Sequence, residues 1–423
     1  MPVAQRRTAR ICARRPCVLL KLPPAILLLI AMKRTRFSRR TKQTPDTDEL
    51  IRLASQLSLS GSRLEDDFWE RRLAIQVERL LTAGNEATLN AALDHLYGAG
   101  GRAYDELADM VEACAECRHH QMAGVAGQDA LLFASPVLAW SRYAIPAGSI
   151  APEVLASLRV HLQAHVLAAD VHFGLADFFY SPDQLPQSYC DTAALTEKLT
   201  KAALHGRDLK LDPAQMAETM NFLSDTRYLI GVVCAPTGAP LFRWQEEDGN
   251  RTDAHKQWRA QGGEALRPLL PACALEPLIP QSFHAAIREA DRASRPYSLR
   301  SAVAFLQTTL NISAANLRAV VAPYYDRQIE EFRIGFTLGD TVEVVHGVVW
   351  PLLENEEEAA EAPGQIEAVL NEAGVPEVLI LDHRFPLEYC DDCGAPLYPN
   401  PEGEPVHAEL PEQEEEAAPR HLH

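Results

Sequence analysis

The sequence predicts an α+β protein: an N-terminal helical bundle followed by two tandem β-α-β plait lobes of the ferredoxin-like type. Three observations predict it. Apolar residues recur at helical spacing through residues 46–122, and strands and helices then alternate from residue 128 onward. The order of elements in residues 128–272 also recurs in residues 273–401. With 423 residues, 47% hydrophobic and 23% charged, the chain can form two or three domains with cores.

The first region is expected to hold four helices joined by short breaks, which is typical of a small antiparallel bundle. Asp46 and Thr47 can cap the first helix, and Gly61 with Ser62 separates it from a second helix at residues 64–81. Asn85 can cap the third helix, which the glycine-rich residues 98–101 end. The fourth helix is expected at residues 104–117.

The first lobe, residues 128–272, is expected to alternate strands and helices. Strands are expected at residues 131–140, 171–180, 227–235 and 239–244, and helices at residues 152–168, 192–204 and 254–270. The sequence Pro236-Thr237-Gly238 predicts a hairpin turn between the last two strands.

The second lobe, residues 273–401, repeats this order and ends in a Cys-x-x-Cys turn. Strands are expected at residues 273–280, 317–325, 331–338, 342–353 and 376–382, with helices from the Ser298 cap to Leu310 and at residues 365–373. Short local similarities, residues 227–231 with 332–335 and 178–184 with 322–328, also favour an internal duplication.

Charge is unevenly distributed along the chain. Residues 1–42 carry twelve Lys and Arg and no acid, which leaves 28 bases against 58 acids and a net charge of −30 for residues 43–423. A region with this much negative charge repels the phosphate backbone of a nucleic acid. We therefore expect no nucleic-acid partner. Residues 402–423 are acidic and poor in hydrophobics, and we expect a disordered tail there.

Residues 1–45 form a basic N-terminal extension with three interpretations. The apolar run at residues 25–32 is too short to span a bilayer, and no small-x-small cleavage site follows it. In the first interpretation, translation starts at Met32 and residues 1–31 are not made. In the other two, residues 1–31 form a targeting or membrane-touching segment, or a disordered tail. Nine scattered cysteines, an odd number, favour a reducing cytoplasm over a secreted disulfide framework.

The leading candidate site is a metal centre at Cys390 and Cys393. Two thiolates at this spacing, followed by Gly394, have the form of one knuckle of a zinc ribbon. Tetrahedral zinc needs four ligands, and His383 and His407 are the first choices for the other two. The alternatives are a pair of inert reduced thiols or a redox dithiol, and the neighbouring aspartates disfavour the latter because they raise thiol pKa values.

Three other clusters carry chemistry-bearing residues. A second Cys-x-x-Cys, Cys114 and Cys117, precedes His119 and His120 on an expected helix. His161 and His165 lie one helical turn apart with Asp170 and His172 nearby, but Leu162 stands where a zincin carries its glutamate, and an amphipathic helix with polar-edge histidines explains the pair. The segment Tyr324-Tyr325-Asp326-Arg327 either binds an anion at a strand end or places its aromatic rings in the core.

The sequence carries no phosphate-binding glycine loop, dinucleotide fingerprint or nucleophile elbow. A non-catalytic cytoplasmic binding or regulatory protein, with a structural zinc and a protein partner, is therefore the leading hypothesis. The alternative is an enzyme, possibly metal-dependent, with its site in the cleft between the two lobes; convergent titratable residues in that cleft would favour it.

Most of the chain, about residues 33–410, resembles a family of uncharacterised bacterial proteins catalogued only as a domain of unknown function. The segments that carry the resemblance are residues 62–65, 68–69, 91–95, 136–143, 161–165, 241–245, 321–326 and 384–401. The resemblance implies a soluble protein that begins near Met32, and it implies no activity.

Overall fold

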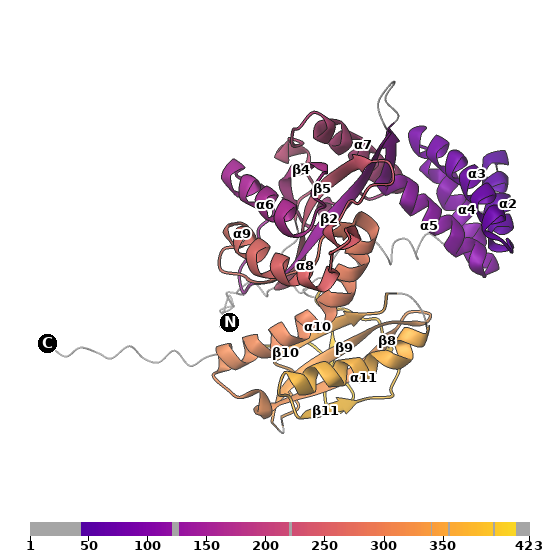
Figure 1. The fold of residues 1–423 in the computed structure, drawn as a ribbon. Coiled ribbons are helices and arrows are strands. Elements are labelled where there is room, and N and C mark those ends of the chain that lie inside the picture. Colours follow the sequence, from indigo (N-terminus) through magenta and orange to yellow (C-terminus); the bar gives the residue numbers. More distant parts are fainter. Residues whose placement is uncertain are drawn as a thin grey trace, which may run out of the picture.

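The computed structural model describes residues 44–120, 127–219, 222–339, 341–353, 356–391 and 394–411, and it has a mixed α+β architecture. A helical bundle, a first sheet and a second sheet follow one another along the chain and occupy separate regions (Figure 1). Residues 1–43, which include most of the expected N-terminal extension and the possible start at Met32, lie outside the described residues. None of the described helices is long and apolar enough to cross a bilayer.

The bundle consists of α2 (Pro45–Ser58), α3 (Arg63–Thr82), α4 (Glu86–Ala99) and α5 (Arg102–Glu116). As expected, the Asn85 side chain caps α4 by accepting a backbone N–H group, and Ser62, expected only at a break, caps α3 in the same way. The cap of α2 is Thr44 rather than Asp46 or Thr47, because Pro45 occupies the first helical position. The apolar positions at helical spacing form one closed core, whose fully buried members include Leu50, Leu73, Leu89, Leu107 and Val111.

The first sheet has the order β1-β2-β5-β4-β3, with β6 and β7 also paired to β2. Its strands are β1 (Cys117–His120), β2 (Gln128–Trp140), β3 (Gly148–Ser149), β4 (His172–Tyr180), β5 (Ser224–Pro236), β6 (Ala274–Pro277) and β7 (Gln281–Ser282). Since β5 is antiparallel to both β2 and β4, the β2-α6-β4 unit, with α6 at Pro152–His165, is a split β-α-β arrangement.

Helices cover both faces of this sheet, so its central strands are apolar on both sides. Phe133 and Val137 pack with α6 and with Trp258, whereas the neighbouring Leu132 and Leu138 pack towards α7 (Tyr189–Leu204) and α10 (Phe283–Leu310). The expected strand at residues 239–244 does not form. The chain instead makes a 3-10 turn, Arg243–Gln245, and the expected helix at 254–270 is divided into α8 (Arg251–Gln257), a π turn at Trp258–Gly262 and α9 (Gly263–Leu266).

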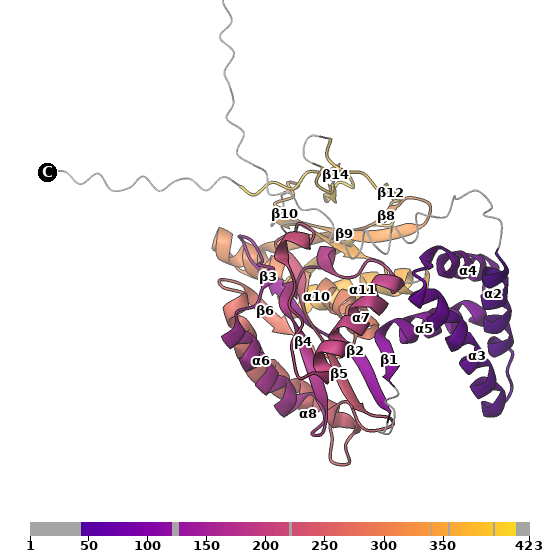
Figure 2. The same ribbon diagram turned by 90° about the horizontal axis from the view of Figure 1, so that it is seen from above.

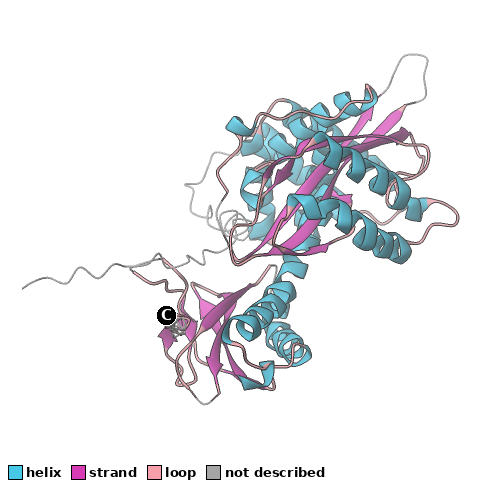
Figure 3. Ribbon diagram, turned by 90° about the vertical axis from the view of Figure 1, so that its left-hand side faces the viewer, coloured by secondary structure: helices cyan, strands magenta, loops and turns pink. Residues whose placement is uncertain are grey.

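The second sheet has the order β10-β9-β8-β11. Its strands form a group apart from those of the first sheet (Figure 3). Its elements are β8 (Leu317–Tyr325), β9 (Ile329–Leu338), β10 (His346–Pro351), α11 (Glu356–Glu372), β11 (Glu377–Ile380) and β12 (Phe385–Pro386). The strands β8, β9 and β10 form an antiparallel meander, and α11 then crosses back so that β11 lies parallel to β8. The strand expected at residues 273–280 does not join this sheet but pairs as β6 with β2 of the first sheet, so the second sheet does not reproduce the expected repeat.

The β9–β10 hairpin joins two strands that the sequence predicts, although β10 begins at His346 rather than at residue 342. Phe336 lies opposite His346, and Ile334 lies opposite Val348. Phe332, Ile334 and Phe336 face a core formed with α10 and α11. The opposite face is covered as well, by the C-terminal hairpin of β13 (Tyr398–Pro399) and β14 (Pro405–Val406) (Figure 2). Residues 402–411, expected in a disordered tail, therefore include a paired strand, and residues 412–423 lie outside the described residues.

Helix α10 is the largest departure from the expected elements. The sequence predicts a helix that starts at Ser298, but one helix runs from Phe283 to Leu310 with Pro296 in its interior. Its first half packs Phe283, Ala286 and Ala290 on the first sheet, and its second half packs residues such as Leu299 and Val303 on the second. Burial at both ends therefore offsets the hydrogen bond that Pro296 removes.

The bundle contacts α10 at the first helical turn. The carboxylate of Glu116, the last residue of α5, accepts the backbone N–H of His284 at 2.9 Å, and Glu112 forms an ion pair with Arg288. This is the position at which a helix favours negative charge. Burial nevertheless raises the pKa of Glu116 to about 7 and lowers the pKa of His284 to about 4. One helix thus contacts the bundle and both sheets.

The hairpin register can be tested with Ile334→Asp, which places a charge in the core of the second sheet. We expect a loss of about 3–5 kcal/mol of unfolding free energy, because the buried carboxylate has no partner. Val342→Asp is the matched control, since Val342 is 43% exposed in the connection between the two strands. Urea unfolding measures both variants, and an Ile334→Asp protein as stable as the control would contradict the register.

The contact between Glu116 and α10 predicts a pH-dependent stability. Because burial raises the pKa of Glu116 from 4.5 to about 7, its contribution to stability is full below pH 4.5 and is lost as the pH rises through 7. Glu116→Gln keeps an oxygen that accepts the His284 N–H, but the amide side chain does not titrate. We expect the variant to gain stability relative to wild type between pH 5 and pH 8, measured by urea unfolding. Glu289→Gln, at an exposed position of α10, should show no such trend; the same trend in both variants would contradict the assignment.

Candidate functional site

The chain makes a tight turn after Cys390. The backbone N–H of Cys390 donates to the carbonyl of Ala395 at 2.7 Å, and the Cys390 carbonyl accepts the N–H of Gly394 at 2.8 Å. Gly394 has a φ of 70°, which a residue with a side chain rarely adopts. Cys393 lies outside the described residues, so the structure describes only one of the two sulfur positions.

The two histidines expected to complete the zinc site have other neighbours. The His383 ring lies beside Gly403 and meets Phe385 edge-on, with ring centroids 6.3 Å apart. His407 Nδ1 lies 3.7 Å from Glu409 Oε1. Within the described parts of the chain, no three His, Cys, Asp or Glu side chains are placed to hold a metal ion. His383, Cys390 and His407 therefore do not form a ligand set by themselves, and zinc binding stays a prediction.

Arg333, which the sequence analysis did not single out, holds the segment on both sides of the Cys390 turn. Its Nη1 donates to the carbonyls of Glu388 at 2.6 Å and Leu397 at 2.9 Å, and its Nε donates to Glu331 Oε1 at 2.6 Å. The guanidinium lies 4.2 Å from the ring centroid of Tyr324, in cation–π contact. Charge on an otherwise apolar strand was the available signal.

The aromatic residues near this arginine lie in the core. Tyr324 is fully buried and stacks on Phe385 with ring centroids 5.2 Å apart. Tyr398 is also buried, and its ring lies directly on Gly347, where an added Cβ would approach it to 2.3 Å. For Tyr324, therefore, the structure agrees with the core alternative rather than with anion binding.

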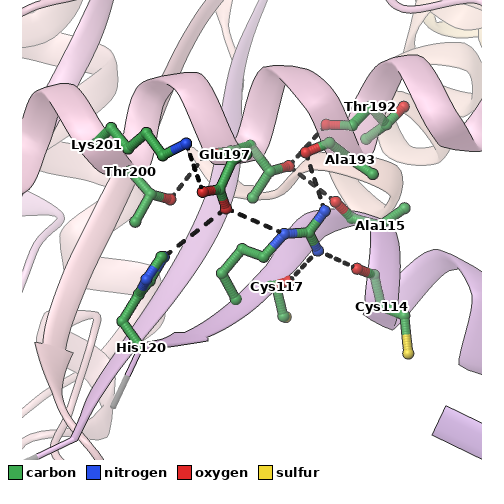
Figure 4. Close-up of polar contacts among 11 residues, drawn as sticks. Cys114, Ala115, Cys117, His120, Thr192, Ala193, Glu197, Thr200 and Lys201 are labelled. Carbon is green, nitrogen blue, oxygen red and sulfur yellow. Dashed lines mark hydrogen bonds and ion pairs between the residues drawn. The ribbon is translucent and has the colours of Figure 1, made fainter. Parts of the chain in front are cut away.

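The second Cys-x-x-Cys lies at the joint between the bundle and the first sheet (Figure 4). Cys114 belongs to α5, but Cys117 begins β1, so the pair does not share the expected helix. Arg118 joins these elements to α7 by donating to the carbonyls of Cys114, Cys117 and Ala193. Burial raises the pKa of Cys114 to about 12, which keeps its thiol protonated and a poor metal ligand.

The histidines near this joint are engaged separately. His119 pairs with Asp129 at 2.7 Å, and His120 Nε2 lies 3.9 Å from Glu197 Oε2, which also lies 3.6 Å from Arg118 Nε (Figure 4). The joint is therefore an ion-pair network that connects α5, β1 and α7.

The pair His161 and His165 lies along α6 as expected. The two rings stack with centroids 5.9 Å apart, and His165 Nε2 lies 3.1 Å from Gln261 Oε1. Neither joins Asp170 or His172 in a metal-binding group among the described residues. The amphipathic-helix interpretation accounts for both histidines.

A pocket lies where the two sheets meet on α10. It is lined by the start of β5, by the middle of α10 and by the end of β10, with contributions from β2 and the turn at Pro182; the lining residues are Leu138, Pro182, Ser224, Asp225, Thr226, Tyr228, Asp291, Ser294, Tyr297, Ser298, Pro351 and Leu353. Ser224 and Ser298 hydrogen-bond across it at 3.0 Å, which links the first sheet to α10. This is the cleft between the two lobes in which the sequence analysis placed a possible enzyme site.

Two carboxyl groups of this pocket differ in their surroundings. Asp225 is buried in an ion pair with Arg227, whose other N–H groups donate to backbone carbonyls including those of Ile145 and Pro146. For the Asp291 side chain, no hydrogen bond or ion pair is recorded among the described residues. Burial raises the pKa of Asp291 to about 7, and the charge of Arg295 opposes that shift only in part.

Sequence reasoning missed Asp291 and its neighbours for one reason. The expected helix begins at Ser298, so residues 283–297 were not assigned to a helix, although Asp291, Ser294 and Ser298 fall on one face of the observed helix. The available signal was the apolar spacing of Phe283, Ala286 and Ala290 before the proline.

The comparisons with known proteins identify a family and no function. A family model described as a protein of unknown function (DUF2863) matches residues 35–421. No curated protein and no solved structure matches the chain. The matched range includes the bundle, both sheets and the Cys390 turn, and it confirms the resemblance seen in the sequence. The chain therefore belongs to the DUF2863 family of proteins of unknown function.

Proposed function

We propose that the protein binds a small polar molecule in the pocket between its two sheets and acts as a binding or regulatory protein in the cytoplasm. The observation that carries this proposal is the carboxyl of Asp291, which lines the pocket, is half-buried and forms no hydrogen bond or ion pair with the described residues. Burying such a group without a partner is costly, and binding sites are where proteins retain that arrangement.

The chemistry of the lining supports a polar ligand. The hydroxyl groups of Ser224, Ser294 and Ser298 belong to the same lining as the carboxyl, and each can both donate and accept a hydrogen bond. Leu138 and Leu353 add apolar surface at the walls. A few polar groups placed in a partly apolar pocket are typical of small-molecule sites.

The position of the pocket supports a regulatory role. Its walls come from both sheets and from α10, and α10 contributes to the cores of both sheets. A ligand that contacts β5 on one side and Pro351 on the other stabilises one orientation of the sheets over others. We propose that a protein partner binds the acidic surface of the molecule when the sheets have this orientation.

A second candidate function is acid–base catalysis at the same pocket. The specific observation is the pKa of Asp291, about 7, since a general acid or base works best near the ambient pH. In this role Asp291 would accept a proton from the bound molecule at neutral pH and return it later. Chemical change in a bound compound, absent with Asp291→Asn, would distinguish this function from binding alone.

We also keep the proposal of one zinc ion per chain at Cys390 and Cys393, with His383 and His407 as the first choices for the remaining ligands. The turn at Gly394 supports it, since such a turn directs backbone amides towards the sulfurs. Because His383 and His407 lie beside other groups, residues other than these two are also candidates for the third and fourth ligands.

The pocket is tested by screening small polar fragments against the full chain with ligand-observed NMR. We expect fragments that bind wild type to lose about 10- to 100-fold in affinity with Asp291→Asn, the worth of one hydrogen bond to a charged group. Glu289→Gln, exposed on the same helix, should bind as wild type does. A screen without binders, or binders unaffected by Asp291→Asn, would contradict the proposal.

The zinc site is tested by elemental analysis of protein purified without chelators or metal-affinity resin. We expect about one zinc per chain in wild type and a large loss in Cys390→Ser. Cys273→Ser is the matched control, because Cys273 is a half-buried free thiol in another part of the chain. Negligible zinc in wild type would leave Cys390 and Cys393 as reduced thiols.

A further inference from the structure

We propose that the molecule bound between the two sheets carries a cationic nitrogen, an ammonium or a guanidinium group, that forms an ion pair with Asp291. This inference rests on the proposed function and adds the chemical class of the ligand. It is carried by the balance of charge and of hydrogen-bond donors around the pocket.

Two carboxyl groups give the pocket its negative charge, and only one of them already has an ion-pair partner. Asp225 and Asp291 both line it, but the Asp225 carboxylate already accepts from Arg227 and from the backbone N–H of Thr226. The Asp291 carboxyl has no such recorded contact among the described residues. A ligand that brings positive charge to Asp291 therefore meets a carboxyl that is available, with a second carboxylate nearby.

The positive charges close to the pocket are directed elsewhere. Arg227 uses Nε, Nη1 and Nη2 on Asp225 and on the carbonyls of Ile145, Pro146 and Thr226. Arg295 donates from Nη1 to the carbonyl of Pro351, and its guanidinium lies 5.1 Å from the ring centroid of Trp350. An anionic ligand would thus meet two carboxyl groups and no guanidinium directed at it, so the field disfavours anions.

The neutral groups of the pocket supply acceptors for the remaining N–H bonds of a cation. The hydroxyl of Tyr297 donates to the carbonyl of Ala274 at 3.0 Å, which leaves its oxygen lone pairs as acceptors. Ser294 donates to the backbone carbonyl of Asp291 at 2.9 Å, so its oxygen also accepts. An ammonium needs up to three acceptors, and a carboxylate with two hydroxyl oxygens provides that number.

The ion pair gives the affinity a defined pH dependence. The charged and titratable groups around Asp291 are Asp225 and Tyr228 on β5, Arg295 and Tyr297 on α10, and Asp183 on the turn beside β5. Burial raises the pKa values of both tyrosines above their usual value near 10, so neither ionises near neutrality. Only the deprotonated form of Asp291 pairs with a cation, so binding releases a proton and weakens as the pH falls below 7.

The experiment uses pairs of small probes with matched shapes. Propylammonium is compared with propanol, guanidinium with urea, and acetate represents anions, each titrated into the full chain at constant ionic strength and followed by protein NMR. We expect the cations alone to shift the resonances of Asp291, Ser294 and Ser298. Their affinity should be about 30-fold weaker at pH 5.5 than at pH 8, the ratio of deprotonated fractions for a pKa near 7.

Variants separate this inference from the proposed function. Asp291→Asn should remove both the preference for cations and the pH dependence, while Glu289→Gln should keep both. Propanol, urea or acetate binding in the pocket as well as the cations would overturn the ligand class and leave the pocket as a binding site. No response to any probe would overturn the cation assignment, and a failed fragment screen would overturn the site itself. The pH dependence of wild type needs no variant, so a poorly folding Asp291→Asn does not prevent the test.

Discussion

The burial of α10 on two sides is the constraint on which the rest of the structure depends. Phe283 and Ala290 complete the core of the first sheet, Leu299 and Val303 complete that of the second, and Glu116 of the bundle contacts its first turn. Removing this helix would expose an apolar face in each sheet. The two sheets are therefore expected to unfold as one cooperative unit even though no strand is shared between them.

A buried ion pair plays a comparable role on the far side of the second sheet. Arg333 and Glu331 are both nearly inaccessible to water, and the desolvation of such a pair is offset only where further hydrogen bonds and ring contacts are present. Here the carbonyls of Glu388 and Leu397 and the ring of Tyr324 supply them. The pair thereby fixes the segment on both sides of the Cys390 turn.

The success of sequence reasoning followed the strength of local signals. The bundle and the β9–β10 hairpin were predicted because Leu50, Leu73, Ile334 and Phe336 occur at regular spacing, and a buried face enforces that spacing. The pairing of residues 274–277 with the first sheet was not predicted, because pairing between distant strands leaves no local pattern. The pocket was missed because Pro296 resembles a helix breaker and only tertiary packing overrides it. Metal ligands cannot be chosen from spacing alone, since His383 and His407 depend on how the C-terminal segment folds back.

Two glycines on the outer face of the second sheet have a consequence for how the protein tolerates mutation. Backbone atoms of Pro399 and the ring of Tyr398 lie where Gly335 and Gly347 would each carry a Cβ, at 2.3 Å in both cases. A single methyl group at either position would push the C-terminal hairpin away from the sheet. Water would then reach Arg333 and Glu331, and the turn that carries Cys390 would lose its support. Mutational sensitivity at this end of the protein should thus be highest at two residues that have no side chain.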